Sequence, residues 1–272
     1  MLLLFLILNT VFSFNINIIN TPFDRGANIK GSRYAFYILK NDIMNSNLNI
    51  KNVKNIECHD IHIRKVFTHI YRHTLFNLED NKLSLQVGGD HSIAIPSIYA
   101  SNNFCQENNK KLGIIWFDAH ADFNTMNTSP SGNIHGVPIS VLCGHTLPFL
   151  TFGEPLDTNQ FAYYGIRDID TLEFQRLQDY NMLILNNKEH LNEWIKNFDK
   201  IHISFDLDCL DPKIFWSINT PVENGLTFDD IYPFFEIIKE SGKLQSVDLV
   251  EYNPLKGKNN NIIINILEKM LI

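Results

Sequence analysis

Cysteine is scarce in this sequence of 272 residues and follows no spacing that is typical of a metal site. The four cysteines lie far apart, and none belongs to a Cys-x-x-Cys pair; they are Cys58, Cys105, Cys143 and Cys209. This pattern argues against a thiolate metal centre. We therefore expect four reduced and mostly buried thiols that serve for packing.

Positive charge is also in short supply. Lys and Arg number 23 against 30 Asp and Glu, which gives a net charge of −7 and a pI near 5.8. A nucleic-acid-binding surface would need a basic patch, so we expect no nucleic-acid partner. The sequence does contain 44% apolar and 19% charged residues. That balance is typical of a globular protein with a sizeable core.

The continuous apolar run at residues 2–8 is too short to cross a bilayer, and we expect no membrane partner. Its length suits a signal peptide, and Val11-x-Ser13 resembles a cleavage site, yet no Lys or Arg precedes the run. Residues 1–13 are read either as a signal peptide or as a hydrophobic extension of the first strand. The protein is accordingly either cytoplasmic or secreted. Residues 14–272 are expected to form a single domain.

Strand-like and helix-like segments alternate along the rest of the chain. The expected strands cover residues 15–20, 53–57, 82–87, 112–117, 161–166, 182–185, 201–205 and 244–250. The expected helices cover residues 33–44, 61–78, 96–107 (capped by Ser92), 139–143, 171–179, 189–198, 229–240 and 260–271. This alternation predicts an α/β fold of three layers, α/β/α, with a single, mostly parallel eight-stranded sheet.

The apolar strand at 112–117 runs into three potential metal ligands. Asp118, His120 and Asp122 follow it at alternate positions. Alternate residues of an extended chain project from the same face, so the three side chains are expected to converge just beyond the strand. In open α/β sheets, ligands bind at that carboxyl edge.

Two other strands end in similar groups. Asp206 and Asp208 follow the strand at 201–205 and are expected to share a face. The pair Gly88-Gly89 permits a tight turn that puts His91 at the same edge. Four carboxylates crowded at one place would repel one another without cations. The pattern therefore predicts more than one metal ion.

The expected ligands offer oxygen and nitrogen but no sulfur, which favours manganese or another hard or borderline divalent ion over zinc. Four carboxylates balance two divalent cations. Two metals about 3.5–4 Å apart can share a water and lower its pKa toward neutrality. Asp118 and Asp206, first in their motifs, are the expected bridging ligands. A hydroxide held there would be a nucleophile.

Four longer motifs carry a resemblance to a known family. They are Gly-Gly-Asp-His-Ser at 88–92, Asp-Ala-His-Ala-Asp-Phe-Asn at 118–124, Ser-Phe-Asp-Leu-Asp at 204–208 followed by Asp211-Pro212, and Glu-Tyr-Asn-Pro at 251–254. Together they resemble the ureohydrolases, dimanganese enzymes that comprise arginases, agmatinases and formiminoglutamases. Ser-Gly-Asn-Ile-His-Gly-Val-Pro at 131–138 is similar to the arginase branch. The resemblance covers roughly residues 14–254.

The resemblance implies two Mn²⁺ ions per chain. One would be bound by His91, Asp118, Asp122 and Asp206, and the other by Asp118, His120, Asp206 and Asp208. A bridging hydroxide, oriented by Asp122, would attack the guanidinium carbon of L-arginine and yield L-ornithine and urea. His135 would be the proton shuttle, which the pKa of histidine suits. Glu251 would accept hydrogen bonds from the guanidinium.

The resemblance also implies contacts with the amino-acid end of the substrate. The positions matching those that bind the α-carboxylate are Asn124, Ser131 and Asn133. The positions matching those around the α-amino group are Asp170, Glu173 and Thr220. For Asp170, a role as the cap of the following helix stays open.

The chain departs from the family pattern in the loop at 213–219. Bulky residues and no glycine stand there in place of the usual Pro-Ala-x-Gly-Thr-Pro pattern. Because the loop is expected beside the substrate, affinity or specificity would be affected. The chain also ends soon after its last helix, without the tail that supports trimers in many relatives. The resemblance therefore leaves a homo-oligomer open.

Other functions compete with this interpretation. An agmatinase or another ureohydrolase would act on a guanidinium without an α-carboxylate, and the segment at 131–133 favours an arginase instead. A two-metal phosphoesterase would normally add an Asn-His pair and further histidines, which the sequence lacks. A catalytically silent, metal-stabilised arginine-binding protein is the alternative of another class. The altered loop at 213–219 is its only support.

Overall fold

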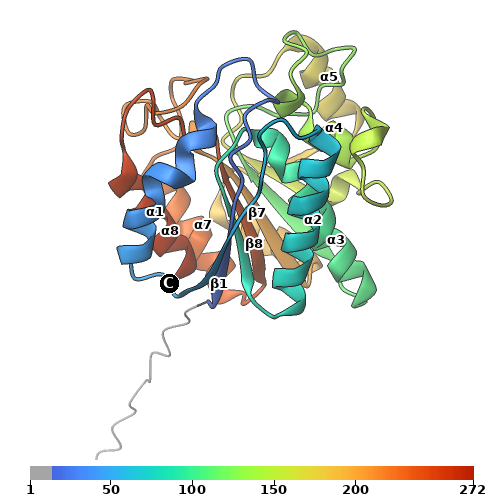
Figure 1. The fold of residues 1–272 in the computed structure, drawn as a ribbon. Coiled ribbons are helices and arrows are strands. Elements are labelled where there is room, and N and C mark those ends of the chain that lie inside the picture. Colours follow the sequence, from blue (N-terminus) through green and yellow to red (C-terminus); the bar gives the residue numbers. More distant parts are fainter. Residues whose placement is uncertain (1–13) are drawn as a thin grey trace, which may run out of the picture.

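The computed structural model describes residues 14–272 (Figure 1). The signal peptide considered for residues 1–13 lies outside this range. The described chain contains an eight-stranded sheet whose neighbours all pair in parallel, in the order β2-β1-β3-β8-β7-β4-β5-β6. Helices cover both faces, which confirms the predicted three-layer α/β/α architecture.

The strands are β1 (Ile16–Asn20), β2 (Ile50–Asn55), β3 (Leu83–Val87), β4 (Leu112–Phe117), β5 (Phe161–Tyr164), β6 (Leu183–Ile184), β7 (Lys200–Asp206) and β8 (Leu244–Val250). The helices are α1 (Ala35–Asn45), α2 (Ile63–Glu79), α3 (Ala94–Glu107), α4 (Pro138–Leu142), α5 (Thr171–Asp179), α6 (Lys188–Trp194), α7 (Phe228–Glu240) and α8 (Asn260–Leu271). Each segment predicted from the sequence therefore has a counterpart.

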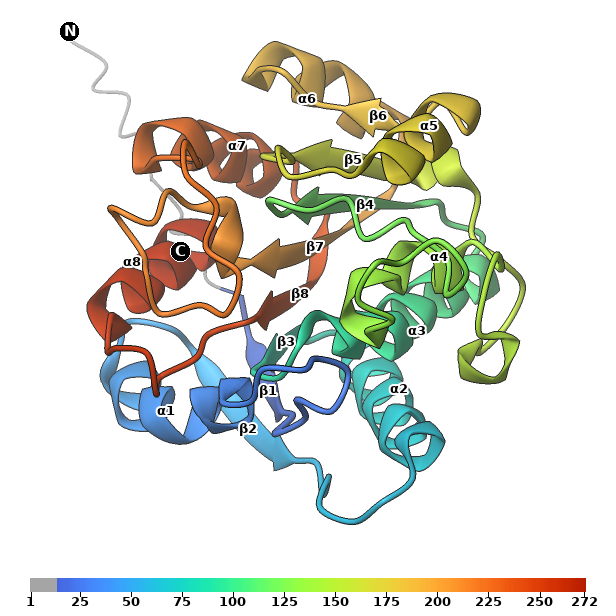
Figure 2. The ribbon, with the colours of Figure 1, turned by 90° about the horizontal axis from the view of Figure 1, so that it is seen from above.

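Two apolar cores hold the layers together, one on each face of the sheet. α1, α6, α7 and α8 pack on one face, and α2, α3, α4 and α5 pack on the other (Figure 2). β3, β4 and β8 are buried along their whole length. Strands covered on both faces favour apolar residues on both, and the sequence of β4 accordingly reads as an unbroken apolar run.

Several boundaries differ from the prediction by one to four residues. β2 begins three residues earlier than expected, because it is an edge strand whose extent is set by pairing with β1 rather than by an apolar pattern. The predicted cap Ser92 is wrong. Asp90 accepts a hydrogen bond from Ser92 N (3.1 Å) and so caps a 3-10 turn, His91–Ile93, that leads into α3.

The carboxyl ends of β3, β8, β7, β4 and β5 follow one another in the sheet. The loops after these five strands therefore meet over one edge, onto which Figure 2 looks. The four cysteines are free and buried, as predicted. None of the described helices has the length and apolar character needed to cross a membrane.

Candidate active site

The chain after β4 curls instead of continuing as a strand. Asp118 Oδ1 accepts a hydrogen bond from His120 N at 2.7 Å, and Asp122 has a left-handed backbone with φ +50°. The expectation that alternate residues share a strand face is therefore wrong. The three side chains nevertheless reach one cavity, because the turn brings them together.

The same correction applies after β7. Asp206 is the last residue of the strand, and its carboxylate accepts a hydrogen bond from Asp208 N at 2.9 Å. This bond caps a 3-10 turn, Leu207–Cys209. Asp206 and Asp208 thus do not share a strand face, although both line the cavity.

A glycine turn delivers His91, as predicted. Gly88 and Gly89 both have φ +92°, and a Cβ on Gly89 would lie 2.6 Å from Phe23 O. The imidazole of His91 stacks on Trp116 with 4.0 Å between ring centroids. Its Nε2 lies 2.8 Å from Ser204 Oγ. With the proton on Nε2, the lone pair of Nδ1 is free to bind a cation.

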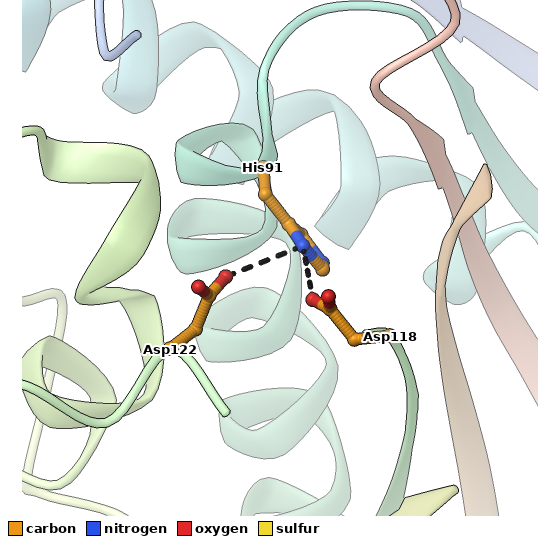
Figure 3. A group of neighbouring side chains, drawn as sticks. All are labelled: His91, Asp118 and Asp122. Carbon is orange, nitrogen blue, oxygen red and sulfur yellow. Dashed lines mark ion pairs between the residues drawn. The ribbon is translucent and has the colours of Figure 1, made fainter. Parts of the chain in front are cut away.

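Figure 3 shows the first of two groups that could hold a metal ion. His91 Nδ1 lies 3.0 Å from Asp118 Oδ2 and 3.4 Å from Asp122 Oδ2. It also lies 3.1 Å from Asp206 Oδ2. All four side chains are buried.

The second group lies beside the first and shares Asp118 with it. His120 Nδ1 is 3.4 Å from Asp118 Oδ1 and 3.1 Å from Asp208 Oδ2. The opposite oxygens of one carboxylate therefore face the two groups, which is the geometry of a bridging ligand. Asp206 contacts the first group and accepts a hydrogen bond from Asp208 N of the second.

Charge at the two groups is unbalanced. Burial raises the pKa of Asp206 and of Asp122, and the neighbouring Asp118 raises both further. Burial opposes protonation of His91, but its hydrogen bonds with Asp118 and Asp206 raise its pKa. These shifts favour protonation, because a proton offsets part of the surplus negative charge. Divalent cations would supply that charge instead, so the donor set fits a metal centre.

Glu251 follows β8 and also has a left-handed backbone, with φ +62°. Its Oε1 accepts a hydrogen bond from His91 N at 2.9 Å and lies 3.1 Å from His135 Nδ1. Its Oε2 is buried and has no hydrogen-bond partner among residues 14–272. Burial lowers the pKa of His135, but its contact with Glu251 outweighs this and raises it.

The start of α5 is bonded to the loop after β4. Asp170 Oδ1 accepts hydrogen bonds from Leu172 N and Glu173 N, so the capping role left open for Asp170 is real. Its Oδ2 accepts from Asn124 Nδ2 at 2.7 Å. Glu173 Oε1 accepts from Phe123 N and Asn124 N. Burial raises the pKa of Glu173 to about 7.

A cavity of about 370 Å³ opens above the two metal-binding groups. It is lined by every residue that the sequence singled out, namely His91, Asp118, His120, Asp122, Asn124, Ser131, Asn133, His135, Asp170, Glu173, Asp206, Asp208, Thr220 and Glu251. Ser131 and Asn133 lie on the more exposed loop at its wall. Gly132 has φ +65° and allows the turn between them.

Sequence reasoning missed Asp168 and Arg167. Asp168 lines the cavity, and its Oδ2 is 3.6 Å from His120 Nε2. Arg167 donates hydrogen bonds to the loop after β7. Their position between β5 and Asp170 was the available signal.

The altered loop at 213–219 does not crowd the cavity. Phe215 and Ile218 are fully buried in the core beneath α7 and α8. Trp216 is 51% exposed but does not line the cavity. Of this segment and the two residues after it, Thr220 alone contributes to the cavity wall. The expected effect of the bulky residues on the substrate therefore finds no steric basis.

The same fold and motifs occur in known proteins. The arginase family model matches residues 15–271. An arginase of Entamoeba histolytica is 34% identical over 229 residues, which are 78% of this chain and 75% of that protein. An arginase of Staphylococcus aureus is 36% identical over 202 residues, which are 68% of this chain and 65% of that protein.

A solved structure gives the same result. The crystal structure of the Entamoeba histolytica arginase in complex with L-ornithine superposes with a TM-score of 0.88 at 27% identity. The superposition covers 95% of this chain and 98% of that one. The paired His and Asp groups lie at the sheet edge that the motifs indicated. Together with the family match, the identities and the superposition, they show that the chain belongs to the arginase family of ureohydrolases, and it is a hydrolase.

Proposed function

We propose that the protein is a dimanganese arginase, which hydrolyses L-arginine to L-ornithine and urea. The observation that carries this proposal is the position of Glu251. Glu251 lines a cavity whose floor holds two His and Asp groups that share Asp118, and its Oε2 is buried and unpaired within the described chain. A guanidinium is a planar cation with five N–H donors and suits such a carboxylate.

Two Mn²⁺ ions suit the donors on the cavity floor, because carboxylates and imidazoles together favour this metal. The ligands would be His91, Asp118, Asp122 and Asp206 for one ion, and Asp118, His120, Asp206 and Asp208 for the other. Bound there, the two ions would make a shared water nucleophilic at neutral pH.

The chain's own residues would position the substrate and move protons. Glu251 would accept hydrogen bonds from the guanidinium and hold its carbon above the cavity floor. Asp122 would orient the attacking water. His135, 3.1 Å from Glu251, would deliver a proton to the nitrogen that leaves with ornithine. The raised pKa of His135 supports this role, because more of the imidazole carries a proton near neutral pH.

The outer part of the cavity suits an amino acid rather than a simple amine. Ser131 and Asn133 offer a hydroxyl and an amide near the mouth, and Asn124 keeps a second amide N–H beside the one bonded to Asp170. These groups would bind the α-carboxylate. The acidic groups of Asp170 and Glu173 would lie near the α-ammonium. Agmatine has no carboxylate and would leave Ser131, Asn133 and Asn124 without a partner.

One assay tests the proposal. The protein is loaded with manganese, and urea release from L-arginine and from agmatine is measured together with metal stoichiometry on the same sample. We expect two ions per chain and a kcat/KM for arginine at least about 10-fold above that for agmatine, as loss of one charge-assisted contact predicts. Preference for agmatine would support an agmatinase. Arginine binding without urea would support the silent binder.

A further inference from the structure

Arg167 follows β5, is half-buried, and points every donor of its guanidinium at backbone carbonyl groups. Nε donates to Glu223 O at 3.1 Å. Nη1 donates to Gly165 O at 3.0 Å and to Cys209 O at 3.1 Å. Nη2 donates to Asp208 O at 2.8 Å, Val222 O at 2.8 Å and Leu210 O at 3.4 Å. A guanidinium has five N–H groups, so none remains free for a ligand.

Five of these six carbonyls belong to the two arms of one loop. Asp208, Cys209 and Leu210 lie on the arm that leaves β7, and Val222 and Glu223 lie on the arm that returns toward α7. Arg167 therefore joins the two arms where they come together, which we call the neck of the loop. The backbone N–H groups of the same neck are bound by a residue of opposite charge, because Asp211 accepts from Lys213 N (2.9 Å) and Gly225 N (3.1 Å).

The loop closed by this neck carries a residue of the cavity wall. Thr220 Oγ1 donates to Asp208 Oδ2 at 3.0 Å. The same oxygen lies 3.1 Å from His120 Nδ1. Both the backbone of Asp208 and the hydroxyl that orients its carboxylate thus depend on how the neck is held.

We propose that Arg167 is a positioning residue for the metal group formed by Asp118, His120 and Asp208. It fixes the backbone of Asp208 directly and the hydroxyl of Thr220 through the returning arm. The other group, formed by His91, Asp118 and Asp122, receives none of its hydrogen bonds. The side chain of Arg167 therefore acts on one of the two metal positions and leaves the other unchanged.

Lysine cannot replace arginine in this role. Its ammonium group carries the same charge but presents three donors from a single point, whereas the planar guanidinium reaches both arms at once. Loss of a residue that supports metal ligands typically weakens metal binding by about 10- to 100-fold. For Arg167→Lys, we expect that loss at one metal position only.

The test is a titration of the full chain with Mn²⁺ in a calorimeter, which measures the affinity of each ion. Its readout rests on the proposed metal site, so the wild-type protein is titrated first and should bind two ions. In Arg167→Lys the first ion should bind as in the wild type and the second about 10- to 100-fold more weakly. Arg64→Lys is the matched control, because Arg64 donates to Thr151 O (2.7 Å) and stacks on Phe152 away from the cavity. It should keep both affinities.

Each result decides a different question. A wild-type protein that binds no manganese contradicts the proposed function and not the role of Arg167. Two unchanged affinities in Arg167→Lys contradict that role, and so does equal weakening of both, which general loss of structure would produce. Thermal unfolding without metal shows whether the variant folds. If it does not, Asp211→Ala loosens the same neck and should again weaken one ion selectively.

Discussion

Replacing Glu251 by glutamine is the sharpest test of how the site binds a guanidinium. Glutamine has nearly the same shape, and its amide oxygen can keep the hydrogen bond from His91 N (2.9 Å). The change removes the negative charge beside His135 and at the unpaired Oε2. It also turns one acceptor into a donor, which would face the N–H groups of the substrate.

The size of the effect follows from these contacts. A hydrogen bond to a charged group contributes about 1.5–3 kcal/mol, against about 0.5–1.5 kcal/mol for a neutral one. Loss of the charge and of one acceptor in a buried site should cost about 2–3 kcal/mol of transition-state binding. That corresponds to a decrease in kcat/KM of about 30- to 150-fold. The decrease should be equal for arginine and agmatine, because both carry the guanidinium.

The pH profile offers a second readout with a definite sign. Contact with Glu251 raises the pKa of His135, against the effect of burial. As a proton donor, His135 loses activity when the pH rises through its pKa. The alkaline limb of the kcat profile should therefore move to lower pH in Glu251→Gln. Unchanged kcat/KM would refute the proposed role of Glu251. An alkaline limb that stays in place while manganese content is normal would refute the proposed role of His135.

Four further variants separate the remaining roles. His135→Ala should lower kcat by about 10²- to 10⁴-fold while both ions stay bound, and full activity would exclude it as the shuttle. Asp118→Asn should lose both ions, whereas His120→Ala should lose one; metal analysis after gel filtration distinguishes them, and equal loss would mean that Asp118 is not shared. Asn133→Ala should raise KM for arginine by about 10-fold and leave agmatine unaffected, in line with one lost hydrogen bond to a charged group. Similar KM changes for both substrates would count against a carboxylate contact.

The sheet and the meeting point of the ligands were predictable because both depend on patterns local in sequence. A buried strand such as β4 reads as an apolar run, and a parallel sheet gathers the residues that follow its strands at one edge. The backbone conformation by which each ligand reaches the cavity was not predictable in the same way. Asp122 reaches the cavity through a left-handed backbone at φ +50°, which the alternation of an extended chain does not allow.

Arg167 shows what sequence patterns leave out. Its partners are backbone carbonyls of residues 165, 208–210 and 222–223, and a carbonyl group looks the same in every residue type. No side chain in the sequence marks them as acceptors. The bulky loop at 213–219 illustrates the converse. Phe215 and Ile218 look like an intrusion beside the substrate until the fold shows that they face the core.

The stacking of Trp116 on His91 gives the protein an internal optical probe. The indole donates a hydrogen bond to Asp118 Oδ2 at 2.9 Å, so it contacts both a nitrogen and an oxygen donor of the metal groups. A cation bound at Nδ1 of His91 would change the charge of the ring that stacks on the indole, and indole emission depends on the charges beside it. Intrinsic fluorescence should therefore report metal loading in the unlabelled protein, without added dye or substrate.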